Sequence, residues 1–551
     1  MPSAASTISF DYAYNSANQR TQVTQGDGSY WIYAYDPLGQ VTSGIKHFSD
    51  GRPVPGEQFG YDFDEIGNRI STAAGGDQYG VNLRYANYSA NALNQYTSRT
   101  VPGAVDIVGS AANNSTVTVN NQPTYRHNDF YQTELALPKT GDAVYQSVTN
   151  LSVLNRGGTT PDLVSNITGN VFLPQTPEHF TYDVDGNMTS DGRWTNSWAA
   201  ENRLTSMTSL STGPSASRLQ LQFVYDHQSR RMQKLVSTWN GSSYTPSYTN
   251  RFVYDGWNVE AEINPTNALI RGYLWGLDLS RTMQTAGGVG GLIATVNATT
   301  SAATNYFACY DGNGNITGHI SGSDGTVFVQ YEYGPFGEII RATGPMAKAN
   351  PLRFSTKYQD DETDLLYYGH RYYSASTGRW LSKDPLGDEA FFRSYSADKD
   401  EIAQMLLRVE SLKPSYVFAL NQPISAIDLL GLDRWEINWI HSWVVVEVRN
   451  KCCSKVIGYK RIEFSPRGEW GGEIIIETAG FVAPGEVSIN YVTKPSGWAP
   501  NYIPSSCAAD KFLLEWAEAM AADPPLYSFW AFNGRHFAAI AQMMGIEETA
   551  P

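Results

Sequence analysis

A short pattern built around a Tyr-Asp pair occurs six times, and this repeat restricts the possible folds more than any other feature of the sequence. In each copy an apolar or aromatic residue stands two positions before the pair, and a turn, often with Gly-Asn, leads into an alternating strand. Strand, Asp- and Gly-rich turn, and strand are typical of a β-hairpin. Hairpins repeated along a chain indicate sheets extended in series, as in solenoids. The six copies begin at Tyr33, Phe59, Phe180, Phe223, Phe252 and Ala308.

The composition agrees with a β-rich chain of several domains. A length of 551 residues is too great for one compact core, so we expect two to four domains. Glycine (49) and tyrosine (34) are abundant, and charged residues make up only 17%. The net charge of −15 argues against nucleic acid as a general partner, because phosphates would be repelled. The four cysteines lack the spacing of a zinc site, and the chain has no apolar run of membrane length. We therefore expect no metal, no cofactor and no membrane span.

Two later segments make the pattern specific. Residues 354–385 contain "LLYYGHRYYSASTGRWLSKDP", and residues 415–432 end in "AIDLLGL". Together with the six repeats, they resemble the Rhs (rearrangement-hotspot) YD-repeat proteins and the related insecticidal toxin-complex C subunits, over roughly residues 8–432. The resemblance implies a mainly β fold in which a spiral antiparallel sheet forms a shell around the chain's own C-terminal toxin. It also implies self-cleavage after the final Leu, a cognate immunity protein, and a secretion-system component that delivers the effector from the bacterial cytoplasm to a target cell.

The changes in pattern along the chain suggest five regions. We expect YD-repeat shell at 1–100 and 176–350, with a small inserted β-domain at 101–175. We expect the Rhs-associated core and its plug at 351–432, and the C-terminal effector at 433–551. The insertion lacks the repeat and is rich in Asn, Thr and Val, so it is either a decoration of a loop or a module that binds carbohydrate or protein. Within the core, an apolar stripe after Ser396 predicts a short supporting helix.

Self-cleavage of the aspartyl type needs two carboxyl groups that share a proton, one acting as base and the other as acid. Asp384 and Asp428 are the candidates in this chain, and the bond to be cut would be Leu432–Asp433. The resemblance brings their two segments together and assigns Arg371 to the family arginine that assists there. The chain departs from the family by having Leu429 in place of proline. The alternative is that the two aspartates only cap turns.

Beyond Leu432 the Tyr-Asp pattern ends and a different type of domain begins. Three segments, "SWVVVEV", "VIGYKRIEF" and "EIIIETAGF", predict β-strands, and two later apolar segments predict helices. This order is similar to circularly permuted papain-like domains of the lecithin retinol acyltransferase-like group, which have an α+β fold.

That resemblance assigns residues to a Cys-His site. His441, before the first of these strands, corresponds to the base histidine, and Asn533-Gly534-Arg535-His536-Phe537 corresponds to an Asn-Cys-Glu-His-Phe motif. A thiolate at the start of a helix would attack an ester or amide to form an acyl-enzyme. Gly534 occupies the nucleophile position, so this site is inactive as written, through natural loss or deliberate replacement.

Other functions compete with this interpretation. Cys507 also precedes a predicted helix and could be a displaced nucleophile, although a buried inert thiol is the simpler reading. The effector could instead be a nuclease or an ADP-ribosyltransferase. Alternatively, the whole chain could be a non-enzymatic surface or adhesion protein built from β-repeats.

Overall fold

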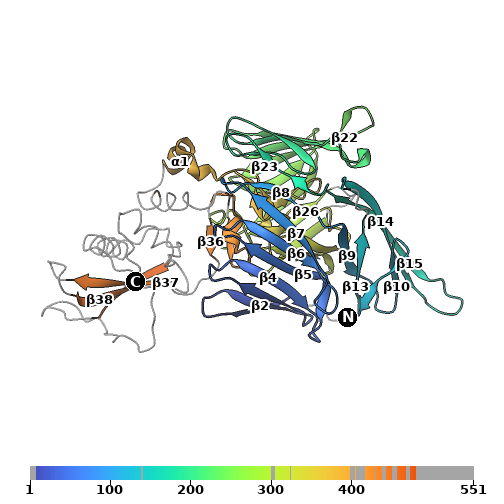
Figure 1. Ribbon diagram of the computed structural model, residues 1–551, viewed down its shortest axis with the longest axis horizontal. Coiled ribbons are helices and arrows are strands. Elements are labelled where there is room, and N and C mark those ends of the chain that lie inside the picture. The colour runs from blue at the N-terminus through green and yellow to red at the C-terminus, as the bar shows by residue number, and fades with distance from the viewer. Residues whose placement is uncertain are drawn as a thin grey trace. The chain divides into compact units, whose positions relative to one another are not determined.

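The computed structural model describes residues 8–137, 141–298, 304–322, 324–397, 404, 416–428 and 430–432, together with the backbone of four strands beyond residue 433. The chain divides into two units, Met1–Ala397 with Ser411–Arg434, and Asp398–Glu410 with Trp435–Pro551 (Figure 1). Each unit is described by itself. The expected mainly β fold, with large antiparallel sheets, is confirmed.

The wall of the first unit begins with a nine-stranded antiparallel sheet in which the first eight strands lie side by side in sequence order. Its strands are β1 (Phe10–Tyr14), β2 (Arg20–Gln25), β3 (Tyr30–Tyr35), β4 (Val41–His47), β5 (Pro53–Phe63), β6 (Arg69–Gly75), β7 (Leu83–Ala90), β8 (Tyr96–Arg99) and β16 (Glu178–His179).

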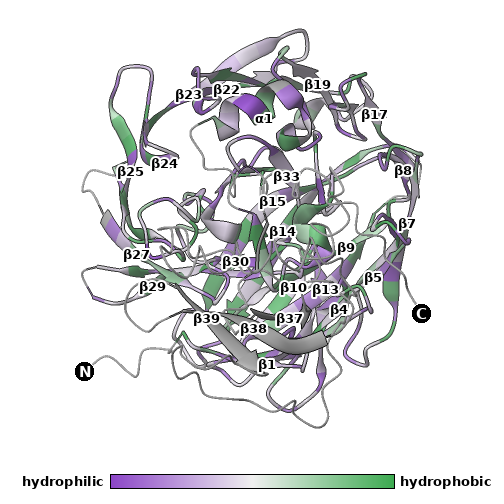
Figure 2. Ribbon diagram, turned by 90° about the vertical axis from the view of Figure 1, so that its left-hand side faces the viewer, coloured by the Kyte–Doolittle hydropathy of each residue, from purple (hydrophilic) through white to green (hydrophobic). Residues whose placement is uncertain are grey.

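A fourteen-stranded sheet continues the wall, again with every strand beside its neighbour in sequence. In Figure 2 the strands of the two sheets follow one another round a ring, from β4 and β5 through β8, β17, β22 and β25 to β29. The strands are β17 (Thr181–Tyr182), β18 (Met188–Ser190), β19 (Trp194–Trp198), β20 (Leu204–Ser209), β21 (Leu219–Tyr225), β22 (Arg231–Trp239), β23 (Tyr244–Asp255), β24 (Asn258–Ile263), β25 (Leu269–Trp275), β26 (Leu292–Asn297), β27 (Thr304–Tyr310), β28 (Ile316–Ser321), β29 (Val327–Tyr333) and β30 (Ile339–Thr343).

The tyrosine and the aspartate of each Tyr-Asp pair have different structural roles. In the turn after β3, Asp36 Oδ1 accepts a hydrogen bond from the Gln40 backbone N–H at 2.8 Å. The same turn places Gly39 at φ +83°, a left-handed conformation that glycine adopts without steric cost. The tyrosine hydroxyl ties its hairpin to the preceding one, as when Tyr225 donates to the Leu204 carbonyl at 2.7 Å. The repeat therefore combines a tight turn, closed by the aspartate, with a hydrogen bond from the tyrosine to the preceding hairpin.

Residues 101–175 build two smaller sheets, with strand orders β11-β10-β14-β15 and β12-β13-β9. Their common apolar cluster contains Val117, Val119, Tyr131 and Val148. The strands are β9 (Ala104–Ser110), β10 (Thr116–Val119), β11 (Gln122–Pro123), β12 (Tyr125–His127), β13 (Phe130–Ala136), β14 (Val144–Leu154) and β15 (Leu163–Leu173).

The core segment packs into the wall as a plug. A small sheet of four short strands, β31 (Tyr358–Gln359), β32 (Leu366–Tyr367), β33 (Tyr372–Ser374) and β34 (Arg379–Trp380), forms its centre. Tyr358, Tyr367 and Tyr372 belong to the same buried cluster as Phe223 and Phe252 of the wall. The plug and the wall therefore share one apolar core.

Buried charges also join plug to wall. Asp360 accepts from Arg231 at 2.6 Å and from Lys234 at 2.9 Å, and all three side chains are almost fully buried. The first and last parts of the wall are joined in a similar way, because Lys46 of β4 forms ion pairs with Glu57 of β5, at 3.3 Å, and with Glu332 of β29.

The helical elements of this unit are short. They are α1 (Glu389–Ser396) and the 3-10 turns η1 (Ser215–Ser217), η2 (Phe354–Thr356), η3 (Pro385–Gly387) and η4 (Phe418–Asn421). Asp388 caps α1 by accepting from the Phe391 N–H at 2.9 Å. Sequence analysis missed α1, and Ser396 is its last residue. The helix predicted after Ser396 falls mainly on residues outside the described ones.

In the second unit the structure describes β37 (Ser442–Arg449), β38 (Val456–Pro466) and β39 (Gly472–Ala479), which form a three-stranded antiparallel sheet. The strand β36 (Arg434–Glu436) lies at the boundary between the units. All three strands predicted from the sequence are thus present. In the part of the chain that the structure describes, no helix is long and apolar enough to cross a membrane.

Candidate active site

The predicted self-cleavage residues lie on three separate segments of the plug. Arg371 lies directly before β33, Asp384 precedes η3, and Asp428 is the last residue of β35 (Ala426–Asp428). Short strands of buried aromatic residues hold these positions, because the plug core contains Tyr368, Tyr373 and Trp380. The side chains of Arg371, Asp384 and Asp428 meet although up to 57 residues separate them in sequence.

Arg371 is the centre of this cluster. Its Nη2 lies 2.7 Å from Asp384 Oδ2 and 3.4 Å from Asp428 Oδ2. Its Nε donates to the Gly431 carbonyl, and its guanidinium stacks on the Trp380 ring at 4.2 Å. The side chain is only 3% exposed, so these contacts occur away from bulk water. One buried cation therefore bridges two carboxylates and the backbone that leads to Leu432.

Asp428 is bound to that backbone through its other oxygen. Its Oδ1 accepts from the Gly431 N–H at 2.6 Å and from the Leu432 N–H at 3.1 Å. Gly431 has φ +75°, and a Cβ there would lie 3.1 Å from the Arg371 backbone and side chain. The absence of a side chain at Gly431 lets the chain fold closely over Arg371. The Leu430 carbonyl accepts from the His370 N–H at 3.1 Å, which fixes the same turn from outside.

Burial gives Asp428 unusual acid–base properties. Desolvation raises its pKa to about 7; Arg371 opposes this shift and the Asp384 carboxylate adds to it. Asp428 therefore exchanges a proton near neutral pH. Asp384 is more exposed, at 18% of its side chain, and its Oδ1 accepts from the Leu386 N–H at 2.9 Å. Two carboxyl groups in such different surroundings suit the two roles of an acid and a base.

Other groups near the site were not found from the sequence. Burial lowers the pKa of Lys357 to about 8, with Asp428 and Asp278 acting in the opposite direction. Burial, aided by the Arg371 charge, also lowers the pKa of His370 to about 4, so this ring is neutral at physiological pH. Neither residue had a spacing signal, because each acquires its surroundings only through packing of the plug.

The capping interpretation of the two aspartates also has a basis in the geometry, since Asp384 caps η3 and Asp428 caps the turn to Leu432.

Among the described residues, no group of three or more His, Cys, Asp or Glu side chains is placed to hold a metal ion. The predicted effector residues His441, Asn533, Gly534 and His536 lie outside the described residues, as do Cys507 and Asp433, at the cleavage bond.

Comparisons with known proteins identify the shell. The Teneurin YD-shell family matches residues 145–424, and the RHS Repeat family matches residues 14–52. A tRNA(Glu)-specific nuclease WapA of Bacillus subtilis subsp. natto is 29% identical over 327 residues, which are 58% of this chain and 11% of that protein. Double-stranded DNA deaminase toxin A of Burkholderia cenocepacia is 24% identical over 233 residues, 40% of this chain and 16% of that protein.

A solved structure of TcdB2-TccC3 is 18% identical, with a TM-score of 0.34, and the match covers 77% of this chain and 20% of that one. This chain therefore spans only a small part of the length of these relatives. The Teneurin YD-shell match covers more than half of the chain and includes the fourteen-stranded sheet and most of the plug. The chain belongs to the Teneurin YD-shell family, as an Rhs-type shell protein related to bacterial polymorphic toxins.

Proposed function

We propose that this chain is an Rhs-type toxin that cuts its own backbone between Leu432 and Asp433. The two carboxyl groups of Asp384 and Asp428 carry out the cleavage, and Arg371 positions them. The observation that carries the proposal is the contact of one buried guanidinium with both carboxylates and with the Gly431 carbonyl, one residue before Leu432.

The chemistry follows from the different surroundings of the two carboxyls. In the proposed step, ionised Asp384 takes a proton from water while the water oxygen forms a bond to the Leu432 carbonyl carbon. Asp428, which has its pKa raised to about 7, supplies the proton that the departing Asp433 nitrogen needs. The C–N bond breaks, leaving a carboxyl group on Leu432 and an amino group on Asp433. Arg371 stabilises the negative charge that remains on the pair.

The released part, residues 433–551, is the proposed effector. One candidate is a papain-like thiol hydrolase or acyltransferase in which His441 is the base and Gly534 occupies the nucleophile position, with Asn533 and His536 beside it. The second candidate is another toxin class, a nuclease or an ADP-ribosyltransferase; the nuclease is favoured by relatives that are named tRNA nucleases. The proposed partners are a cognate immunity protein and a secretion-system component. The proposed destination of the effector is a target cell.

The cleavage proposal is tested with variants of the full chain produced in bacteria. Asp428→Asn and Asp384→Asn each remove a group that transfers a proton, so we expect cleavage to slow by about 10²–10⁴-fold. Asp388→Asn is the matched control, because Asp388 caps α1 and has an exposed side chain close in sequence. Cleavage of both active-site variants at the rate of the control would rule out the aspartyl mechanism.

The effector candidates are separated by growth of bacteria that express the full chain with and without Gly534→Cys. Growth arrest only with the cysteine, abolished by adding His441→Ala, supports the thiol enzyme. Arrest by the glycine form, accompanied by cleaved tRNA, supports the nuclease. Normal growth in both cases contradicts both candidates and leaves a structural or binding role for residues 433–551.

A further inference from the structure

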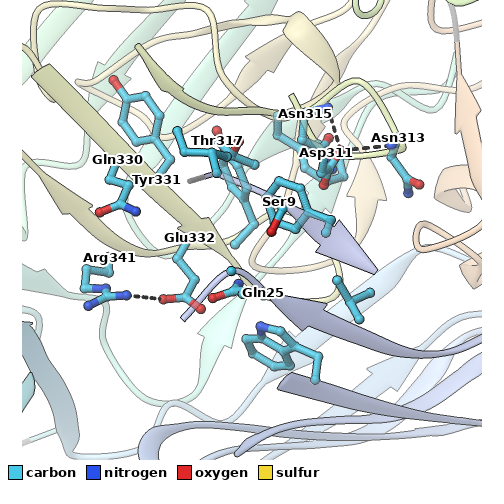
Figure 3. A pocket seen from close by; sticks show the side chains of 18 of the residues that line it. Ser9, Gln25, Asp311, Asn313, Asn315, Thr317, Gln330, Tyr331, Glu332 and Arg341 are labelled. Atoms are coloured by element: carbon cyan, nitrogen blue, oxygen red, sulfur yellow. Dashed lines mark hydrogen bonds and ion pairs between the residues drawn. The ribbon is translucent and has the colours of Figure 1, made fainter. Parts of the chain in front are cut away.

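A cavity of about 510 Å³ lies where the first strands of the wall meet the last ones (Figure 3). One side is formed by β1, β2 and β3, and the other by the turn after β27 and by β28 and β29. In Figure 3, Asp311, Asn313 and Asn315 of the turn lie at one end of the lining, and Glu332 and Arg341 lie at the other. Its volume is within the range of sites that bind small molecules or short peptide segments.

Arg20 is the unusual group in this lining. The residue is only 5% exposed, and its Nε is buried without a hydrogen-bond partner. Its guanidinium stacks on the Tyr12 ring at 4.1 Å, but within the described part of the chain no carboxylate forms an ion pair with it. A buried cation that forms no ion pair is costly, so the site is well suited to an anion supplied from outside.

The neighbouring acids are already engaged. Asp311 Oδ1 accepts from the Asn313 and Asn315 backbone N–H groups at 2.9 and 3.0 Å, which serves the turn. Glu332 accepts from Arg341 at 2.9 Å and forms the ion pair with Lys46. Arg341 is thereby ion-paired, whereas Arg20 feels the Asp311 carboxylate only at a distance, and no ion pair joins the two.

Asn313, which also lines the cavity, holds a second unpartnered polar atom. Its Nδ2 donates to the Pro423 and Ile424 carbonyls at 3.1 and 2.8 Å, which fixes the orientation of the amide. Its Oδ1 is buried and has no partner. The amide is therefore held so that one acceptor remains for an N–H group.

We propose that this cavity binds the C-terminal residue of a peptide, whose carboxylate pairs with Arg20, whose amide N–H donates to Asn313 Oδ1, and whose apolar side chain lies among Phe10, Trp31 and Tyr33. A carboxylate and an adjacent amide N–H satisfy the two unpartnered groups together. Asp27, Asp129, Asp311 and Glu332 also line the cavity, so a dianionic phosphate would meet more repulsion than a singly charged carboxylate.

The test uses the purified full chain and the dipeptide acetyl-Gly-Phe, titrated by calorimetry at pH 7. We expect the free acid to bind at least roughly tenfold more tightly than its C-terminal amide, because only the acid forms a charge-assisted bond with Arg20. This comparison needs no variant. Equal affinity for acid and amide, or no binding at millimolar concentrations, would overturn the proposal.

Variants and a second anion sharpen the result. Arg20→Gln should reduce the affinity for the acid to that of the amide. Arg52→Gln is the matched control, because Arg52 is exposed, paired with Asp50 at 2.6 Å, and absent from the cavity lining; it should leave the affinity unchanged. Phenyl phosphate should bind more weakly than the acid, and tighter binding of phenyl phosphate would show that the site selects phosphate.

Discussion

The buried ion-pair cluster between plug and wall leads to a quantitative prediction. Asp360 has a side chain that is 1% exposed and contacts both Arg231 and Lys234. Replacing it by asparagine leaves two buried cations with one remaining carboxylate, that of Glu362, at 3.0 Å from Lys234. Removing one partner of a buried pair typically costs about 3–5 kcal/mol, because the other charge stays desolvated. We expect Asp360→Asn to lower the free energy of unfolding by that amount.

The assay is urea unfolding followed by tryptophan fluorescence, with Glu201→Gln as the control. Glu201 pairs with Arg203 at 2.9 Å, but its side chain is 65% exposed, so water screens the pair and its loss should cost far less than the loss of Asp360. A cost for Asp360→Asn that is no larger than the control would refute the assignment of the cluster as an anchor of the plug.

The pH dependence gives an independent check. The Arg231 and Lys234 charges outweigh desolvation and lower the pKa of Asp360 below its usual 3.8. A carboxyl whose folded pKa is depressed contributes stability that is complete above its unfolded pKa and is lost as the pH falls through the folded one. The difference in stability between wild type and Asp360→Asn should therefore be constant above pH 5 and shrink below about pH 3.8. A difference that grows with acid would contradict this account.

Three further predictions follow from single residues. Asp428 has a pKa of about 7, so its proton is lost as the pH rises through that value. The cleavage rate of the chain after refolding from urea should therefore fall between pH 6 and 8. A rate that rises over this range would contradict the role of Asp428 as the acid. Gly67→Ala and Gly157→Ala should each cost about 1–2 kcal/mol because both glycines have a left-handed backbone, and the space around Gly157 is open. Gly67→Ala should cost roughly 1 kcal/mol more than Gly157→Ala, because the new Cβ at position 67 would lie 3.1 Å from Asn421 Nδ2. Equal costs of the two variants in urea unfolding would disprove this crowding. Burial raises the pKa of Glu57 to about 7, so ionisation of Glu57 weakens the fold as the pH rises from about 4.5 to 7. The free energy of unfolding of Glu57→Gln should therefore increase by about 1–3 kcal/mol relative to that of wild type between pH 5 and pH 8. If this difference stays constant, Glu57 is not buried as described.

The repeats were predictable from sequence because their chemistry is local. A turn such as Asp64–Asn68 is closed by its own residues: the Ile66 and Asn68 N–H groups donate to Asp64 Oδ1, and Gly67 supplies the left-handed residue. Pattern analysis therefore found the hairpins and the antiparallel order of their strands. The three strands after residue 441 were found for the same reason.

Contacts between distant segments were not predictable in this way. The ion pair of Lys46 with Glu332 joins residues 286 apart, and no local pattern links them. Arg20 was likewise an ordinary strand residue in the sequence, and only packing of β1 to β3 against the turn after β27 buries it. The pairing of Asp384 with Asp428 was expected solely from the family resemblance, and the central position of Arg371 between them is a product of the plug fold.

The most direct test of the central claim is to determine the new chain ends in the purified protein by N-terminal sequencing and mass spectrometry. The account predicts one new N-terminus at Asp433 and a matching C-terminus at Leu432 in the wild-type chain, and an intact chain in Asp428→Asn. A wild-type chain that stays intact, or one cut at another bond, would contradict self-cleavage by the Asp384–Asp428 pair.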